Sequence, residues 1–151
     1  MAGCGDSNGE NVMALAPTIR FQAENATGVA FGATDTISVA GKFLQITTAT
    51  GVLESTIELT PIPATAGNGL ANGAFYTSAT IDCTNGGTTQ YLQGDFLLTA
   101  TLSTTGAAGN VNVIVQSSPD GGTTWAANGV GQQVGSVVFS GTGTLTADVK
   151  M

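Results

Sequence analysis

Hydrophobic and polar residues alternate along much of the chain, and clusters of Gly, Pro, Asn and Asp interrupt the alternation about every ten residues. A period of two predicts strands with one buried and one exposed face. The clearest example spans residues 90–104, where Phe96, Leu98, Ala100 and Leu102 occupy one face of the predicted strand. Helical periodicity appears nowhere over a useful length, so the pattern predicts an all-β protein.

Eight or nine strands follow from the pattern. The segments are 18–22, 36–39, 43–48, 52–59, 75–83, 90–104, 111–116, 134–140 and 142–150. Ala40-Gly41-Lys42 and Gly141 are candidate hairpin turns between consecutive strands, whereas Pro61 and Pro63 end a strand and 64–74 forms a long loop. The expected architecture is an antiparallel β-sandwich, either jelly-roll or immunoglobulin-like.

The 151 residues suffice for one domain with a real core. We expect residues 17–151 to form the sandwich and residues 1–16 to form an extended N-terminal arm. The first part of that arm is small, polar and rich in glycine: Met1, Ala2, Gly3, Cys4, Gly5, Asp6, Ser7, Asn8, Gly9, Glu10 and Asn11. Such a segment is either a floppy terminus or an arm that orders against a neighbouring molecule, and in the second case it binds a partner.

Charged residues make up only 9% of the chain, which carries a net charge of −7. Its three cations are Arg20, Lys42 and Lys150. Three scattered cations cannot track a phosphate backbone or an anionic membrane surface, so neither nucleic acid nor membrane is an expected partner. No apolar run approaches the roughly 20 residues of a membrane-spanning helix.

Catalytic chemistry has few candidate residues. The chain contains no histidine, which excludes histidine-based triads and zinc sites with histidine ligands. Asp82, Asp95 and Asp120 are candidate paired carboxylates, and Asp120 or Asp82 is a candidate calcium ligand, but nothing in the sequence places any two of them together. We therefore expect a protein that is not an enzyme and has neither a metal nor a cofactor.

Three further features leave alternatives open. Cys4 and Cys83 form either a disulfide or two free thiols. Asn25-Ala26-Thr27 matches the glycosylation pattern, although such triplets also arise by chance. A carbohydrate-binding surface would need exposed rings, and Trp125, Tyr76 and Tyr91 are the candidates.

The sharpest local motif is Ser118-Pro119-Asp120-Gly121-Gly122-Thr123-Thr124-Trp125. It resembles the Asp-box pattern Ser-x-Asp-x-Gly-x-Thr-Trp, which in sialidases and related propellers recurs once per blade and is structural. Here it occurs once, in a chain too short for a propeller. We therefore expect Ser118, Asp120, Gly122, Thr124 and Trp125 to form a structural turn.

The order of features from Tyr91 to Trp125 is a strand, a loop of small residues, an alternating valine strand and the SPDGGTTW turn. With the charge-poor, Gly/Thr/Ala-rich composition, this resembles small β-sandwich proteins of tailed bacteriophages, and capsid decoration (cement) proteins in particular. The resemblance covers about a quarter of the chain by motif and the whole chain only by composition.

The resemblance implies a virion protein made in the bacterial host cytoplasm. Its expected function is to bind the outer capsid surface and stabilise it. Its expected partners are the major capsid protein and copies of itself, as a trimer, with the N-terminal arm clipping neighbours. Two alternatives stay open: a carbohydrate-binding or adhesin-like module, and a tail or fibre component.

Overall fold

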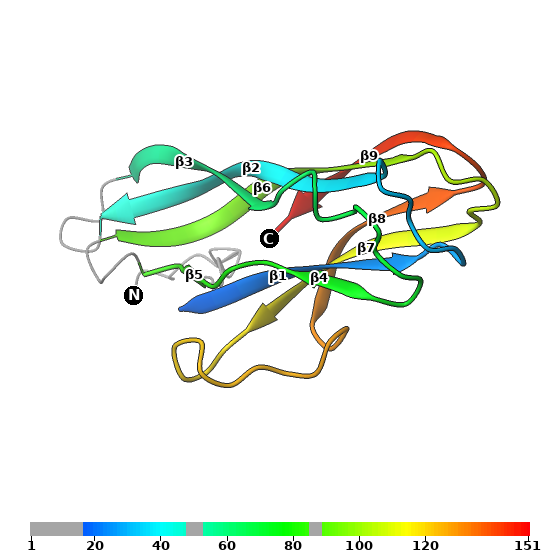
Figure 1. The fold of residues 1–151 in the computed structure, drawn as a ribbon. Helices are drawn as coiled ribbons and strands as arrows, with labels where there is room; N and C mark the ends of the chain where they lie inside the picture. Colours follow the sequence, from blue (N-terminus) through cyan, green and yellow to red (C-terminus); the bar gives the residue numbers. More distant parts are fainter. Residues whose placement is uncertain (1–16, 48–52, 85–88) are drawn as a thin grey trace, which may run out of the picture.

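Two antiparallel sheets packed face to face form the molecule (Figure 1). The computed structural model describes residues 17–47, 53–84 and 89–151. Within these ranges the strands are β1 (Thr18–Ala26), β2 (Thr36–Thr47), β3 (Leu53–Ile62), β4 (Phe75–Thr77), β5 (Ile81–Asp82), β6 (Thr89–Leu102), β7 (Gly109–Ser117), β8 (Gln132–Phe139) and β9 (Gly143–Lys150). Helices are absent from the described part of the chain, and the predicted antiparallel β-sandwich is confirmed.

The first sheet has the order β4-β1-β7-β8, with β5 also pairing with β1, and the second has the order β3-β2-β6-β9. We call them sheet A and sheet B. The chain crosses between the sheets repeatedly, and among the described strands only β2–β3 and β7–β8 pair with the next strand along the chain. The order departs from that of immunoglobulin domains, whose last two strands lie in one sheet, because β8 and β9 lie in different sheets.

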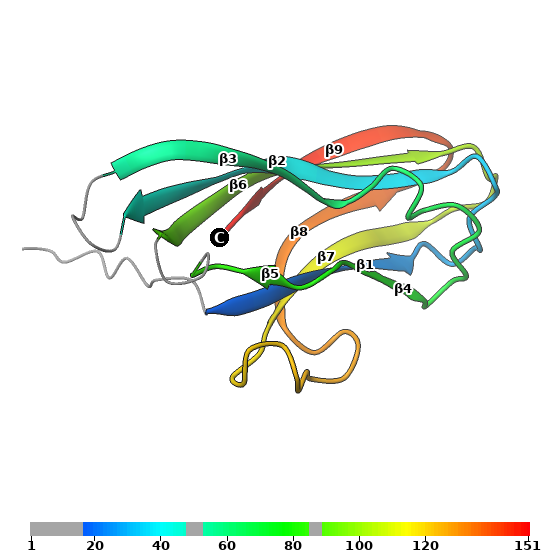
Figure 2. The same ribbon diagram turned by 60° about the vertical axis from the view of Figure 1, so that its left-hand side comes forward.

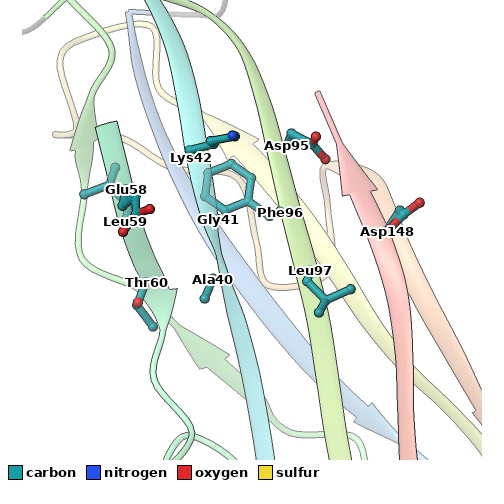
Figure 3. Close-up of a pocket in the computed structure, with 10 residues that line it drawn as sticks. All are labelled: Ala40, Gly41, Lys42, Glu58, Leu59, Thr60, Asp95, Phe96, Leu97 and Asp148. Carbon is teal, nitrogen blue, oxygen red and sulfur yellow. The ribbon is translucent and has the colours of Figure 1, made fainter. Parts of the chain in front are cut away.

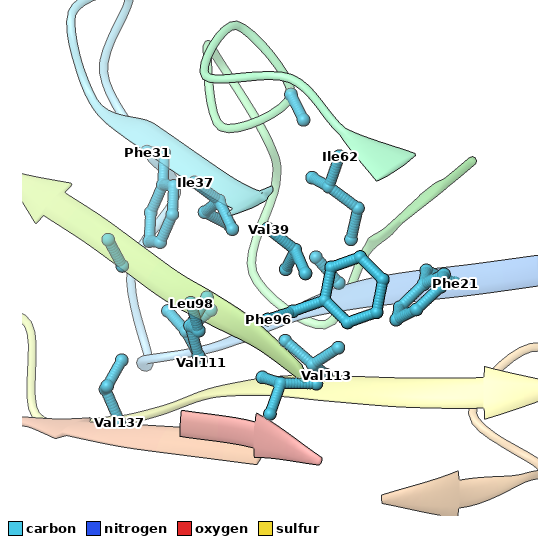
Figure 4. Close-up of a cluster of buried hydrophobic side chains, with 14 of the residues drawn as sticks. Phe21, Phe31, Ile37, Val39, Ile62, Phe96, Leu98, Val111, Val113 and Val137 are labelled. Carbon is cyan, nitrogen blue, oxygen red and sulfur yellow. The ribbon is translucent and has the colours of Figure 1, made fainter. Parts of the chain in front are cut away.

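The core lies between the sheets and is filled by the inward positions of the alternating pattern (Figure 4). The predicted face of β6 is correct, since Phe96, Leu98, Ala100 and Leu102 are all buried. A chain of aromatic contacts crosses the core. Phe21 of sheet A meets Phe96 edge-on at 5.3 Å, Phe96 meets Phe43 at 5.0 Å, and Phe43 stacks on Tyr91 at 4.7 Å. These rings tie the two sheets together.

The two predicted hairpins are wrong. Residues 36–47 form one continuous strand, and Gly41 lies in its middle, opposite Phe96 of β6. A Cβ atom at Gly41 would lie 2.5 Å from the Phe96 Cα atom, so glycine here permits a close backbone approach rather than a turn. At the other end of the chain, the segment around Gly141 leads from sheet A to sheet B, and β8 and β9 pair with β7 and β6.

The strands at residues 53–62 and 75–82 also differ from the prediction. Strand β3 continues through Pro61 to Ile62, because it is an edge strand and a missing backbone N–H can face outward there. The segment predicted as one strand over 75–83 is two short strands, β4 and β5, separated at Ser78. The backbone of Phe21 donates to the Ser78 hydroxyl at 2.9 Å, so a side chain replaces one backbone bond of the ladder.

Candidate functional site

The Asp-box motif folds into a turn that is organised by one carboxylate. The Ser118 hydroxyl donates to Asp120 Oδ1 at 2.7 Å, and the amides of Thr123 and Thr124 donate to the same oxygen at 3.2 and 2.8 Å. The Gly122 amide in turn donates to the Ser118 oxygen at 2.8 Å. Hydrogen bonds from Thr124 and Ser118 lower the pKa of Asp120 to about 2, so the carboxylate stays ionised as an acceptor.

Trp125 folds back over this turn and closes it. Its indole N–H donates to the Gly122 carbonyl oxygen at 2.9 Å. The Arg20 guanidinium stacks on the indole ring with its central carbon 4.4 Å from the ring centroid, and Arg20 Nε donates to Gln116 Oε1 at 2.8 Å. The five predicted turn residues therefore lie in one turn, and the polar groups of the motif form hydrogen bonds that hold its backbone.

The whole segment between β7 and β8, residues 118–131, leaves sheet A on its outer side (Figures 1 and 2). Two buried glutamines anchor this β7–β8 loop. Gln116 donates through Nε2 to the carbonyl oxygens of residues 127 and 130, at 2.7 Å each. Gln22 donates to Asn128 Oδ1 at 2.8 Å and accepts from the Gly129 amide at 3.0 Å. Both glutamines occupy positions that alternation assigns to solvent, so the pattern gave no sign of this anchor.

The three candidate carbohydrate-binding rings lie in different surroundings. Tyr91 is buried and stacked on Phe43 in the core. Trp125 is half-buried beneath Arg20, and Tyr76 is half-buried on β4. Phe43 therefore covers a ring face of Tyr91, and Arg20 covers one face of Trp125.

The candidate carboxylates lie on three different segments of the chain. Asp82 lies at the end of β5, Asp95 on the outer face of sheet B, and Asp120 in the β7–β8 loop. Among the described residues, no group of three or more Cys, Asp or Glu side chains lies close enough to hold a metal ion. The structure therefore does not gather the three predicted acidic residues into one site.

Asn25 is fully buried, and its side-chain N–H groups donate to the carbonyl oxygens of Val29 and Leu70 at 2.9 Å each. The side-chain amide of Asn25 therefore holds two loops together and is not accessible in the folded protein.

Cys83 is also fully buried and is a free thiol. Burial, followed by the charge of Asp82, raises the pKa of Cys83 to about 12, so this thiol stays protonated. Cys4 lies outside the described residues.

The outer face of sheet B carries a shallow hollow of about 700 Å³ (Figure 3). Ala40 and Gly41 of β2 are among the residues that line it, and these small residues leave space. Leu97 of β6 stands beside the hollow and is 46% exposed, which makes it one of the few large apolar side chains that the described residues present to solvent. A hollow and an apolar side chain thus lie next to each other on one open sheet face.

Charged residues of alternating sign form a row across this face. Strand register places Glu58 of β3 opposite Lys42 of β2, Lys42 opposite Asp95 of β6, and Asp95 opposite Lys150 of β9. All four side chains are exposed. A second row lies next to it along the strands, in the order Thr60, Ala40, Leu97 and Asp148 (Figure 3).

No protein-family model, no curated protein and no solved structure matches the chain. The described residues include no helix with the length and hydrophobicity needed to cross a membrane. The predicted arm, residues 1–16, lies outside the part of the chain that the structure describes.

Proposed function

We propose that the chain is a non-enzymatic structural protein of a virus particle, which decorates the outer surface of the capsid and stabilises it. The observation that carries the proposal is that four buried polar side chains hold loops in place. Gln22, Asn25, Asp35 and Gln116 each fix a loop by hydrogen bonds, and none of them lines the hollow of sheet B. These four buried polar side chains serve to hold loops.

Loops that are held by buried hydrogen bonds suit a protein that stabilises a shell through surface contacts. A decoration protein gains its effect by binding the assembled shell and not the separate subunits, which shifts the equilibrium towards the shell by mass action. A rigid surface loses little conformational entropy on binding, so more of the contact energy remains as affinity. The charge-poor composition and the resemblance of residues 91–125 to phage sandwich proteins support the same proposal.

The N-terminal arm is the proposed attachment segment. Its residues 1–11 are too small and polar to build a core of their own, and a segment of that kind gains order when it binds a partner surface. The sandwich has its own core between sheets A and B, so removal of the arm is expected to leave the fold intact.

Co-sedimentation with intact particles tests the proposal. We expect the full chain to pellet with particles from its source lysate in numbers comparable to the major shell protein. A chain without residues 1–11 should keep its circular dichroism spectrum and melting temperature but bind fewer copies. A Val138→Ser chain, changed at an exposed position of β8, serves as the matched control and should bind like the wild type.

Other outcomes would contradict the proposal. A few copies per particle would point to a tail or fibre component, and no copies would remove the particle as partner. Unchanged binding of the truncated chain would exclude the arm as the attachment segment.

A further inference from the structure

From the outer face of sheet B we infer a contact between two copies of this chain, related by a twofold axis that runs along the strands. The inference goes beyond the proposed function and does not depend on it, because it rests on the charges and shape of one surface. The structure shows that surface open, with Lys42, Asp95 and Lys150 all exposed.

The charge row has the symmetry that such a contact needs. In a twofold contact the same patch meets itself, so a patch must complement its own rotated copy. Rotation about an axis parallel to the strands, between β2 and β6, brings Glu58 onto Lys150 of the second copy and Lys42 onto Asp95 of the second copy. Every contact in the row then joins opposite charges.

The row also excludes the other in-plane axis. A twofold axis perpendicular to the strands and along the row would place each residue on itself, so that Lys42 would meet Lys42 and Asp95 would meet Asp95. Like charges held face to face oppose association. The charge order therefore selects the axis that runs along the strands, about which the strands of the two copies run in the same direction.

In the neighbouring row, the shape of the surface favours the same twofold axis as the charges do. The same rotation places Leu97 of each copy over Ala40 of the other, where the hollow lies. It also places the Thr60 hydroxyl beside the Asp148 carboxylate of the second copy, as a donor beside an acceptor. The apolar side chain left exposed on one copy thus fills the space left empty on the other.

The net charge of the two rows permits self-contact. In the two rows of described side chains, Glu58, Asp95 and Asp148 against Lys42 and Lys150 leave a net charge of −1, whereas the whole chain carries −7. Both lysines of the chain lie on this one face. Two acidic chains can therefore meet here with little general repulsion.

The contact is small. Four strands about 4.8 Å apart and about seven residues long at roughly 3.4 Å each cover roughly 450 Å² per copy. A total of about 900 Å² belongs to weak or transient interfaces, so we expect dissociation in the micromolar to millimolar range. Sedimentation of the full chain from about 10 μM to about 1 mM covers that range.

Exchange of two charges gives the sharpest test. Lys42→Glu alone sets a new carboxylate against Asp95 at two symmetry-related places, and Asp95→Lys alone sets two ammonium groups together at the same places. Each single variant should associate at least about tenfold more weakly than the wild type. A mixture of the two variants should recover association, since every contact between unlike chains again joins opposite charges. Val138→Ser, on β8 of the other sheet, should associate as the wild type does.

The wild type should approach about 30 kDa with rising concentration, twice the 14.9 kDa of one chain. Thermal unfolding at low concentration checks that each variant keeps its fold, and Leu97→Ser, which removes the apolar contact without changing charge, provides a second weakened variant. A wild type that stays at 14.9 kDa over the whole concentration range or settles at about 45 kDa, the mass of three chains, would overturn the proposal. So would a mixture of the charge variants that associates no better than either alone.

Discussion

Replacement of Asp35 by asparagine should strongly destabilise the fold, because this buried carboxylate holds together the loops at one end of the sandwich. Its Oδ1 accepts from the Ser103 amide and hydroxyl at 2.6 Å each, and its Oδ2 accepts from the Thr104 hydroxyl at 2.6 Å and the Gly32 amide at 2.8 Å. Burial by itself would raise the pKa of Asp35, but these four hydrogen bonds lower it well below the usual range.

The expected magnitude follows from the geometry. An asparagine can keep one oxygen towards Ser103, but its NH₂ group would then face the two donors of Thr104 and Gly32. Loss of two charge-assisted bonds at about 1.5 kcal/mol each gives roughly 3 kcal/mol at pH 7. Asp148→Asn, the same change at an exposed position of β9, should cost little and serves as the control.

The effect should depend on pH with a defined sign. Because the folded-state pKa lies below the unfolded value of about 3.9, the ionised Asp35 contributes its full stability above that value, and the contribution is lost as the pH falls towards the folded-state pKa. At pH 3 about 1 kcal/mol of the difference between wild type and Asp35→Asn should have disappeared.

Urea unfolding at pH 7 and pH 3, at micromolar protein concentration, measures both quantities. Equal stability of wild type and Asp35→Asn at pH 7 would refute the assignment of Asp35 as an anchor. A difference that is the same at both pH values would refute its charge as the cause.

Three further substitutions or modifications test other parts of the structure. Gly41→Ala should lower the free energy of unfolding by about 3 kcal/mol, since its Cβ would press on the β6 backbone, and a denaturant midpoint equal to wild type would contradict the close approach. Gln116→Ala should release the β7–β8 loop and lower the free energy of unfolding by about 2 kcal/mol. The fluorescence emission of the single tryptophan, Trp125, should shift to the red. An emission spectrum that matches the wild type would show that the loop keeps its structure without Gln116. Cys83, studied in a Cys4→Ser chain, should resist a thiol reagent at pH 8 until the protein unfolds, because its pKa is raised to about 12; rapid labelling of the native chain would show that the thiol is accessible.

The strands that alternation predicted best are those with one face in the core. In β6, Phe96 to Leu102 alternate cleanly, and the burial of every second residue follows directly from the pleat of the strand. The local turn at Ser118 to Trp125 also forms within the motif that identified it, since its hydrogen bonds join residues two to four apart in the sequence. Local chemistry of this kind is visible without a fold.

Glycine misled the prediction because it has two structural uses. At Gly41 the chain stays extended, and the missing side chain admits the backbone of β6. Around Gly141 the chain turns, but it passes into the other sheet instead of folding back on its neighbour. Whether a glycine marks a bend or a close contact depends on which strand lies beside it, and Phe96, the partner of Gly41, is far from it in the sequence.

Residue types and neighbours a few positions away were enough to predict the all-β class, the inward faces of the strands, the charge-poor surface and the turn of the Asp-box motif. They did not reveal what Gln22 and Gln116 anchor, which residues surround Asn25 and Asp35, or that Glu58, Lys42, Asp95 and Lys150 stand in one row. Those groups come from strands far apart in the chain, and their meeting depends on strand order and register, which are set by packing between sheets and not by any local pattern.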